Sequence, residues 1–180
     1  MSNLKLGTAI AGFTNLATAV QDVDIVEIAF PFSDTAAETL ATQQAFDIAL
    51  KAGYTLDQLF AMVEAANIQI PIILRMYANP VYHYGKERFM AKCKALGIKA
   101  IAFQDAPFAE NGEFEPAATA CGIAIVNTLY ANHGVQVEAI AKAAKAYVYV
   151  AGTPAEVAEI TARVGKVTEV PCISRNLREI

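Results

Sequence analysis

Short apolar runs rich in β-branched residues recur along the chain, and longer stretches with helical spacing of apolar residues separate them. The short runs have the length and composition of buried strands, and the longer stretches those of amphipathic helices. Regular alternation of the two is typical of parallel βα units. The pattern predicts seven strands, at Lys5–Gly12, Asp24–Pro31, Ile70–Tyr77, Ala100–Asp105, Ile123–Leu129, Ala146–Ala151 and Lys166–Ile173.

The starts of two helices carry clear capping signals. Thr55 with Gln58 three residues later predicts a capping box, and Thr153 before Pro154 predicts an N-cap followed by a first-turn proline. The links between elements are short and none is low in complexity, so we expect a single domain over residues 1–180. The predicted helices are Leu56–Ala66, Lys86–Leu96, Glu115–Cys121, Val135–Lys145 and Ala155–Val164.

Polar side chains interrupt the predicted strands near their carboxyl ends. Strand alternation places Glu27 and Arg75 on one face of the second and third strands, and it groups Asn127 with Ile125 on the fifth. An unpaired charge in a dry core costs several kcal/mol, so these residues imply a wet cavity or a mutual ion pair. We expect a ligand site here rather than a structural polar network. The residues so placed are Glu27, Arg75, Gln104, Asn127 and Tyr149.

Charge and composition exclude several classes of function. The 180 residues include 18 acidic and 14 basic side chains, for a net charge of -4, so no basic surface for nucleic acid or anionic membranes is expected. No apolar run reaches the roughly 20 residues that cross a bilayer, and the start lacks a secretory signal, so we expect a cytoplasmic protein. The three cysteines, Cys93, Cys121 and Cys172, are far apart in the sequence, so we expect reduced thiols and no metal site. The two histidines, His83 and His133, lie in predicted loops, and we expect both on the surface.

Four segments resemble the α subunit of tryptophan synthase. They are DIVEIAFPFSDTAAETLATQQAFDIALKAGYTLDQLFAMVEAA (Asp24 to Ala66), PIILRMYANPVYHYGKERF (Pro71 to Phe89), IAFQDAPFAE (Ile101 to Glu110) and YVYVAGT (Tyr147 to Thr153). The resemblance implies a (β/α) barrel without a cofactor of its own. It also implies retro-aldol cleavage of indole-3-glycerol phosphate, with indole passed to a β subunit that carries pyridoxal phosphate.

The resemblance also implies roles for individual residues. Glu27 matches the family's general acid toward the indole ring carbon, and Glu38 stands where the family has an aspartate that binds the indole nitrogen. The added methylene moves the carboxylate by about 1 Å, which can cost on the order of 100-fold in rate. Other matched positions are the pocket-lining aromatics Tyr77 and Tyr149 and, near the family's β-subunit contact, Pro31, Ser33, Asp34 and Asn79.

The chain departs from the family in its substrate pocket. Arg75, Gln104 and Asn127 occupy positions that are apolar in the family, and the glycine-rich phosphate loops after strands 7 and 8 have no counterpart. A smaller and more polar substrate is therefore an alternative to indole-3-glycerol phosphate. Arg75 is either an anion receptor, which we favour, or a partner of Glu27 that would weaken that acid as a proton donor.

The chain is short for the fold that it resembles. A complete barrel of this kind takes about 250 residues, so 180 predicts a barrel truncated to about seven strands, without the eighth βα unit. The missing unit would leave an exposed sheet edge, so we expect either a barrel closed by seven strands or an edge covered by a second copy of the chain. We therefore expect a homo-oligomer. A carbon–carbon lyase is the leading hypothesis. The alternatives are a non-catalytic subunit that activates a pyridoxal-phosphate enzyme, and a small-molecule sensor.

Overall fold

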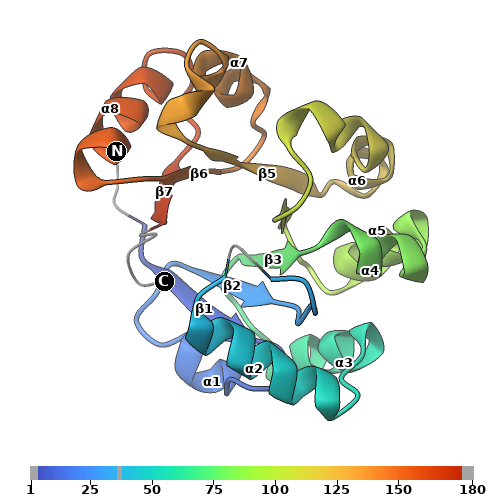
Figure 1. Ribbon diagram of the computed structural model, residues 1–180. Coiled ribbons are helices and arrows are strands. Elements are labelled where there is room, and N and C mark those ends of the chain that lie inside the picture. The colour runs from blue at the N-terminus through green and yellow to red at the C-terminus, as the bar shows by residue number, and fades with distance from the viewer. Residues whose placement is uncertain (1–3, 36–37, 176–180) are drawn as a thin grey trace.

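The computed structural model describes residues 4–35 and 38–175 (Figure 1). Seven parallel strands form one sheet in the order β1-β2-β3-β4-β5-β6-β7, as the alternating pattern predicts. Consecutive strands are neighbours throughout, which is the arrangement of a (β/α) barrel. The strands are β1 (Leu6–Ile10), β2 (Ile25–Ala29), β3 (Ile72–Met76), β4 (Ala100–Phe103), β5 (Ala124–Leu129), β6 (Val148–Ala151) and β7 (Cys172–Arg175).

Helices connect the strands and cover the outside of the curled sheet (Figure 1). The predicted capping box is present at Thr55, and the predicted N-cap at Thr153 also forms a capping box. Each threonine hydroxyl accepts from the backbone N–H three residues later, and its own backbone N–H donates to the side chain of that residue, Gln58 or Glu156. The helices are α1 (Leu16–Ala19), α2 (Leu40–Lys51), α3 (Leu56–Ala66), α4 (Ala78–Tyr84), α5 (Lys86–Ala95), α6 (Glu115–Cys121), α7 (Gln136–Ala143) and α8 (Pro154–Val164), with 3-10 turns η1 (Phe108–Glu113) and η2 (Ala131–His133).

Two local predictions are wrong. His83 lies on α4 rather than in a loop, because the proline of the Asn79-Pro80 pair sits in the first helical turn, where its missing N–H costs nothing. The last strand begins at Cys172 and not at Lys166, because the backbone N–H groups of residues 166–168 still bond to the end of α8. The first error concerns a whole helix that the pattern did not predict, and the second concerns the start of a strand; neither changes the order of strands.

The two faces of the sheet have different surroundings. Val26, Ile28 and Leu74 pack outward against the helices in the largest apolar cluster. Ile25 and Ile73 belong to a smaller cluster that fills the interior of the curl. Glu27 and Arg75 follow these two residues at a spacing of two, so their side chains also enter the interior.

The face predicted for the polar residue of β5 is wrong. Ala124 and Val126 belong to the interior cluster, whereas Ile125 packs against the outward one, so Asn127 also lies on the helix side. A strand buried on both faces is apolar throughout, and alternation then gives no sign of which face points inward.

The curl is an incomplete barrel. β1 and β7 stand at the two ends of the strand order, so closure by seven strands does not occur among the described residues. Thr8 on β1 is exposed although Leu6, two residues earlier on the same face, packs against the interior cluster. None of the helices described is long and apolar enough to cross a membrane.

β5 changes partner along its length. Its first half pairs with β4, ending at Ala102 with Val126, and its second half pairs with β6 from Asn127 to Leu129. The chains that leave β4 and β5 therefore diverge at the carboxyl end of the sheet.

Candidate active site

Adjacent strands bring a carboxylate and a guanidinium together inside the curl. Glu27 on β2 is directly opposite Ile73, and Arg75 on β3 is directly opposite Ala29, so the charged residues are two positions apart in register. Glu27 is 1% exposed and Arg75 is 8% exposed. Arg75 Nε lies 3.0 Å from Glu27 Oε1, a distance at which two buried charges are paired.

A second carboxylate reaches the same arginine from the loop before α2. Glu38 is also buried, and its Oε1 accepts a hydrogen bond from the NH1 group of Arg75. The Tyr77 hydroxyl, 3.4 Å away, donates to the same oxygen. Gln43 on α2 holds the loop in place by donating to the carbonyl oxygens of Thr35 and Glu38 at 3.1 and 2.9 Å.

A tyrosine completes the group from across the interior. The Tyr149 hydroxyl, on β6, donates to Glu27 Oε2 at 2.5 Å and so connects β6 to β2. The arginine cluster, as we name it, contains Glu27, Glu38, Arg75, Tyr77 and Tyr149. Each carboxylate thus contacts one arginine nitrogen and one phenol, an arrangement that fixes both acids in a water-poor interior.

The charges of the cluster stabilise the protonated forms of its basic and phenolic members. Burial acts to lower the pKa of Arg75, but Glu27 and Glu38 outweigh it and raise the pKa above its ordinary value. Burial and the neighbouring Glu38 also raise the pKa of Tyr77. Arg75 therefore remains a cation and Tyr77 a hydrogen-bond donor across the physiological pH range.

Five of the seven residues predicted for catalysis or substrate binding meet in this cluster, and two do not. Gln104 follows the end of β4, and Asn127 bonds outward to Asn111 of η1, whose Nδ2 donates to Asn127 Oδ1 at 2.8 Å. No sequence signal pointed to Asn111, because η1 has neither helical nor strand periodicity. Arg75 is paired with Glu27, the second of its two interpretations; a role in binding an anion remains a prediction.

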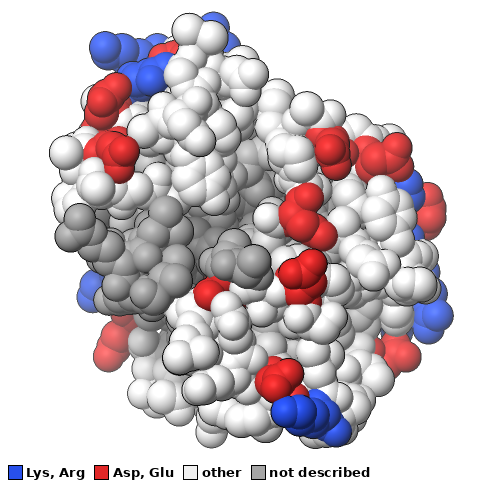
Figure 2. All heavy atoms as spheres, viewed as in Figure 1, with Lys and Arg blue, Asp and Glu red and all other residues white. Residues whose placement is uncertain are grey.

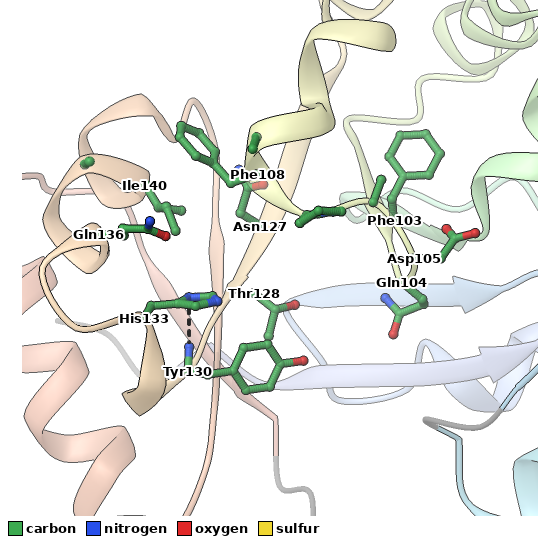
Figure 3. A pocket seen from close by; sticks show the side chains of 14 residues that line it. Phe103, Gln104, Asp105, Phe108, Asn127, Thr128, Tyr130, His133, Gln136 and Ile140 are labelled. Atoms are coloured by element: carbon green, nitrogen blue, oxygen red, sulfur yellow. Dashed lines mark hydrogen bonds between the residues drawn. The ribbon is translucent and has the colours of Figure 1, made fainter.

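A cavity of about 520 Å³ opens beside the cluster, between the carboxyl ends of β4 and β5 (Figure 3). Gln104 and Asn127 both line it, whereas no member of the arginine cluster does. The polar residues predicted for one pocket are therefore divided between two places.

The residues predicted for partner binding lie at the same end of the sheet. Pro31, after β2, is buried, whereas Ser33, Asp34 and Asn79 are exposed in the segments that follow β2 and β3. Acidic side chains occupy the middle of the face seen in Figure 2, with basic ones toward its periphery. This distribution offers little attraction to a phosphate from that direction.

Parallel βα units curled around ionisable groups toward the carboxyl ends of the strands have the architecture of a (β/α) barrel, a fold whose sites lie at that end. The sequence model of the tryptophan synthase alpha chain family matches residues 8–172. The chain belongs to this family, which confirms the resemblance seen in the sequence.

Individual relatives share part of their length with this chain. The tryptophan synthase alpha chain of Caldicellulosiruptor saccharolyticus is 35% identical over 127 residues, which are 71% of this chain and 50% of the relative. That of Picosynechococcus is 34% identical over 149 residues, 79% of this chain and 56% of the relative. The chain thus spans about half the length of the curated relatives it matches.

Solved structures agree with the fold. A structure of the tryptophan synthase α2β2 complex from Pyrococcus furiosus superposes with a TM-score of 0.87 at 24% identity, covering 96% of this chain and 78% of that one. The α subunit from Campylobacter jejuni gives 0.81 at 22%, covering 96% and 77%. At these identities the likeness concerns the fold, and the activity has to be argued from the site.

Proposed function

We propose that the chain is a carbon–carbon lyase of the retro-aldol type, acting on indole-3-glycerol phosphate or a smaller, more polar analogue. One observation carries the proposal. Glu27 and Glu38, which stand where the family has its acid and its base, converge on the buried cation of Arg75. A pair of carboxylates fixed in one interior has the composition required for coupled proton donation and removal.

In this reaction each carboxylate exchanges one proton with the substrate around one bond cleavage. Glu27 would donate a proton to the ring carbon, and Glu38 would accept the proton of the ring nitrogen. The side-chain hydroxyl then gives its proton to the carboxylate of Glu27, which restores that acid. As the carbon–carbon bond breaks, its electron pair returns to the ring and the aldehyde forms. The ring nitrogen recovers its proton from Glu38, so indole and aldehyde carry all the atoms of the substrate.

Arg75 determines which substrates can enter. Its guanidinium is occupied by Glu27 and Glu38, so an incoming group has to exchange with one of them. Only an anion can replace a carboxylate at a buried guanidinium without leaving the cation unpaired. We therefore infer that the substrate presents a phosphate or carboxylate to Arg75 and displaces Glu38, which then faces the reacting atoms.

Indole release from indole-3-glycerol phosphate tests the proposal. We expect release by the wild-type chain and a loss of about 100-fold or more in Glu27→Gln, because general acid catalysis contributes on this scale. Glu38→Asp restores the side chain of the family and should raise the rate. Glu138→Gln, which alters a partly exposed carboxylate on α7, is the matched control and should leave the rate unchanged.

Three results would count against the proposal. Absence of indole from the wild-type chain and from Glu38→Asp would exclude the family reaction. Absence of aldehyde from shorter phosphorylated and carboxylated analogues would then exclude the polar variant. Equal rates for wild type and Glu27→Gln would remove Glu27 from the mechanism.

A non-catalytic subunit is the second candidate. The charges of Glu27, Arg75 and Glu38 already satisfy one another, as in a purely structural network, and Ser33 and Asp34 are exposed where another protein can reach them. Mutual activation is a property of the α2β2 complex from Pyrococcus furiosus, and one chain of that structure has a fold similar to that of this chain. By this proposal the chain binds a β subunit that carries pyridoxal phosphate and raises its turnover.

Co-elution with such a β subunit, and its rate with and without the chain, test the second candidate. We expect binding at micromolar concentration and a higher rate, both reduced by Asp34→Ala and unaffected by Glu27→Gln. Lack of association at that concentration would exclude it.

A further inference from the structure

The cavity between β4 and β5 arises from the divergence of the two strands. Pairing of β4 with β5 ends at Ala102, after which the chain runs through Gln104 and Asp105 to η1. β5 continues beside β6 and leads through Tyr130 to η2 and α7. The cavity occupies the angle between these paths, and its volume of about 520 Å³ is within the range of small-molecule sites.

The lining combines aromatic walls with uncharged polar groups. Figure 3 shows Gln136, His133 and Ile140 on one side of the space and Gln104, Asp105 and Phe103 on the other, with Phe108 and Tyr130 also facing it. Phe108 and Tyr130 are 38% and 39% exposed, so part of each ring is accessible to a ligand. The amides of Gln104, Asn127 and Gln136 supply both donors and acceptors.

The charge of the lining selects against anions. None of the 14 residues that line the cavity is a lysine or arginine. The carboxylate of Asp105 is the acidic group, and its Oδ1 already accepts from the backbone N–H of Ala78 at 2.8 Å. A phosphate would therefore meet a carboxylate and no cation, which makes its desolvation costly.

A buried amide behind the cavity lacks part of its hydrogen bonding. Asn111 Nδ2 donates to Asn127 Oδ1, but Asn111 Oδ1 has no hydrogen-bond partner among the described residues, although the residue is 8% exposed. Asn127 and Phe108 line the main cavity and also a smaller one, of about 90 Å³, that Asn111 lines. Because buried amide oxygens are normally satisfied, the smaller cavity behind the main one requires a hydrogen-bond donor.

We propose that the cavity between β4 and β5 binds a neutral, planar nitrogen heterocycle of the nucleobase type, as the free base or the nucleoside. Aromatic rings stack on such bases regardless of their identity, and asparagine and glutamine amides match the adjacent donor and acceptor of a base edge. Phe108 and Tyr130 would form the stacking walls, and Asn127 would bind the edge.

The inference goes beyond the lyase proposal and does not depend on it. Glu27, Glu38 and Arg75 do not line the cavity, so ligand binding and carbon–carbon cleavage can be separated by mutation. A Glu27→Gln chain that has lost indole release should bind the heterocycle as the wild type does.

Calorimetric titration with adenine, adenosine, AMP and indole tests the proposal. We expect adenine and adenosine to bind and AMP to bind at least about tenfold more weakly, because the phosphate finds no cation. Tyr130→Ala, at a partly exposed position that should not disturb folding, should weaken adenine binding by about tenfold or more. Asn127→Leu should do the same, with circular dichroism confirming that this buried variant is folded.

Three outcomes would overturn the proposal. They are no heat with adenine or adenosine at millimolar concentration, AMP binding as tightly as adenosine, and binding of indole alone. The last would make the cavity a site for the lyase product. Adenine binding that survives both Tyr130→Ala and Asn127→Leu would place the ligand elsewhere on the molecule.

Discussion

Replacement of Arg75 should cost the protein much of its stability. Removal of its charge leaves Glu27 and Glu38 buried without a cation, and breaking a buried pair of this kind costs about 3–5 kcal/mol. We expect Arg75→Met to lower the free energy of unfolding by about that amount in urea titrations. The wild type and the variant should unfold with similar denaturant slopes, because the same surface is exposed.

A compensated variant is the control for this prediction. Neutralising the partners together, in Arg75→Met, Glu27→Gln and Glu38→Gln combined, should recover most of the lost stability, since no buried charge remains. If Arg75→Met alone is within about 1 kcal/mol of the wild type, the cluster is better hydrated than its burial indicates.

At the level of single residues, the interior charges could be identified from the sequence, but not all their contacts. Glu27 and Arg75 could be placed on one face because they follow Ile25 and Ile73 at a spacing of two. The contact of Arg75 with Glu38 could not be foreseen, because it depends on the loop that Gln43 fixes. Asn127 was assigned to the wrong face because both faces of β5 are apolar.

At the level of elements, one ion pair joins α7 to α8. Arg163 on α8 donates from Nε and NH2 to the two carboxylate oxygens of Glu138 on α7, at 2.8 and 2.9 Å. Hydrogen bonds from Arg163 lower the pKa of Glu138 from 4.5 to about 2. The pair is therefore a measurable link between two neighbouring helices.

The sign of this shift gives a pH dependence. The pKa of Glu138 is lower in the folded chain than in the unfolded chain. The stabilisation of the folded chain by the Glu138–Arg163 pair is therefore fully present above about pH 4.5 and is lost as the pH falls through about 2. An NMR titration of the Glu138 carboxyl carbon should give a midpoint near 2, and Arg163→Gln should return it toward 4.5. A midpoint near 4.5 in the wild type would show that the pair is broken in solution.

Prediction of the elements was best where capping chemistry is local. The bounds of α3 follow from Thr55 and its capping box, a signal contained in four residues. The start of β7 could not be foreseen, because the turn after α8 and the pairing with β6 decide it. Strand order followed from the alternation of elements alone, whereas register, and with it the split between β4 and β5, required the tertiary structure.

At the level of the whole molecule, the sheet ends in two strands that each lack a neighbour on one side among the described residues. β1 and β7 each pair with one described strand, and parallel strands buried on both faces are normally paired on both sides. Thr8 on β1 is exposed because no described strand follows on that side of the sheet. A chain that spans half the length of its relatives thus keeps their strand order while leaving the barrel incomplete.

We expect the open edges to drive self-association, because unpaired backbone groups on an edge are templates for another strand. Light scattering during gel filtration should give a mass of at least two chains at micromolar concentration.

Ser174→Lys places a charge at an exposed position of β7, and edge lysines oppose pairing, so this variant should shift the mass toward one chain. Ala65→Lys adds the same charge on the exposed side of α3 and should leave the mass unchanged. A wild-type chain that remains monomeric would show that the edges are tolerated in water, and equal effects of the two lysines would attribute association to net charge instead of the edge.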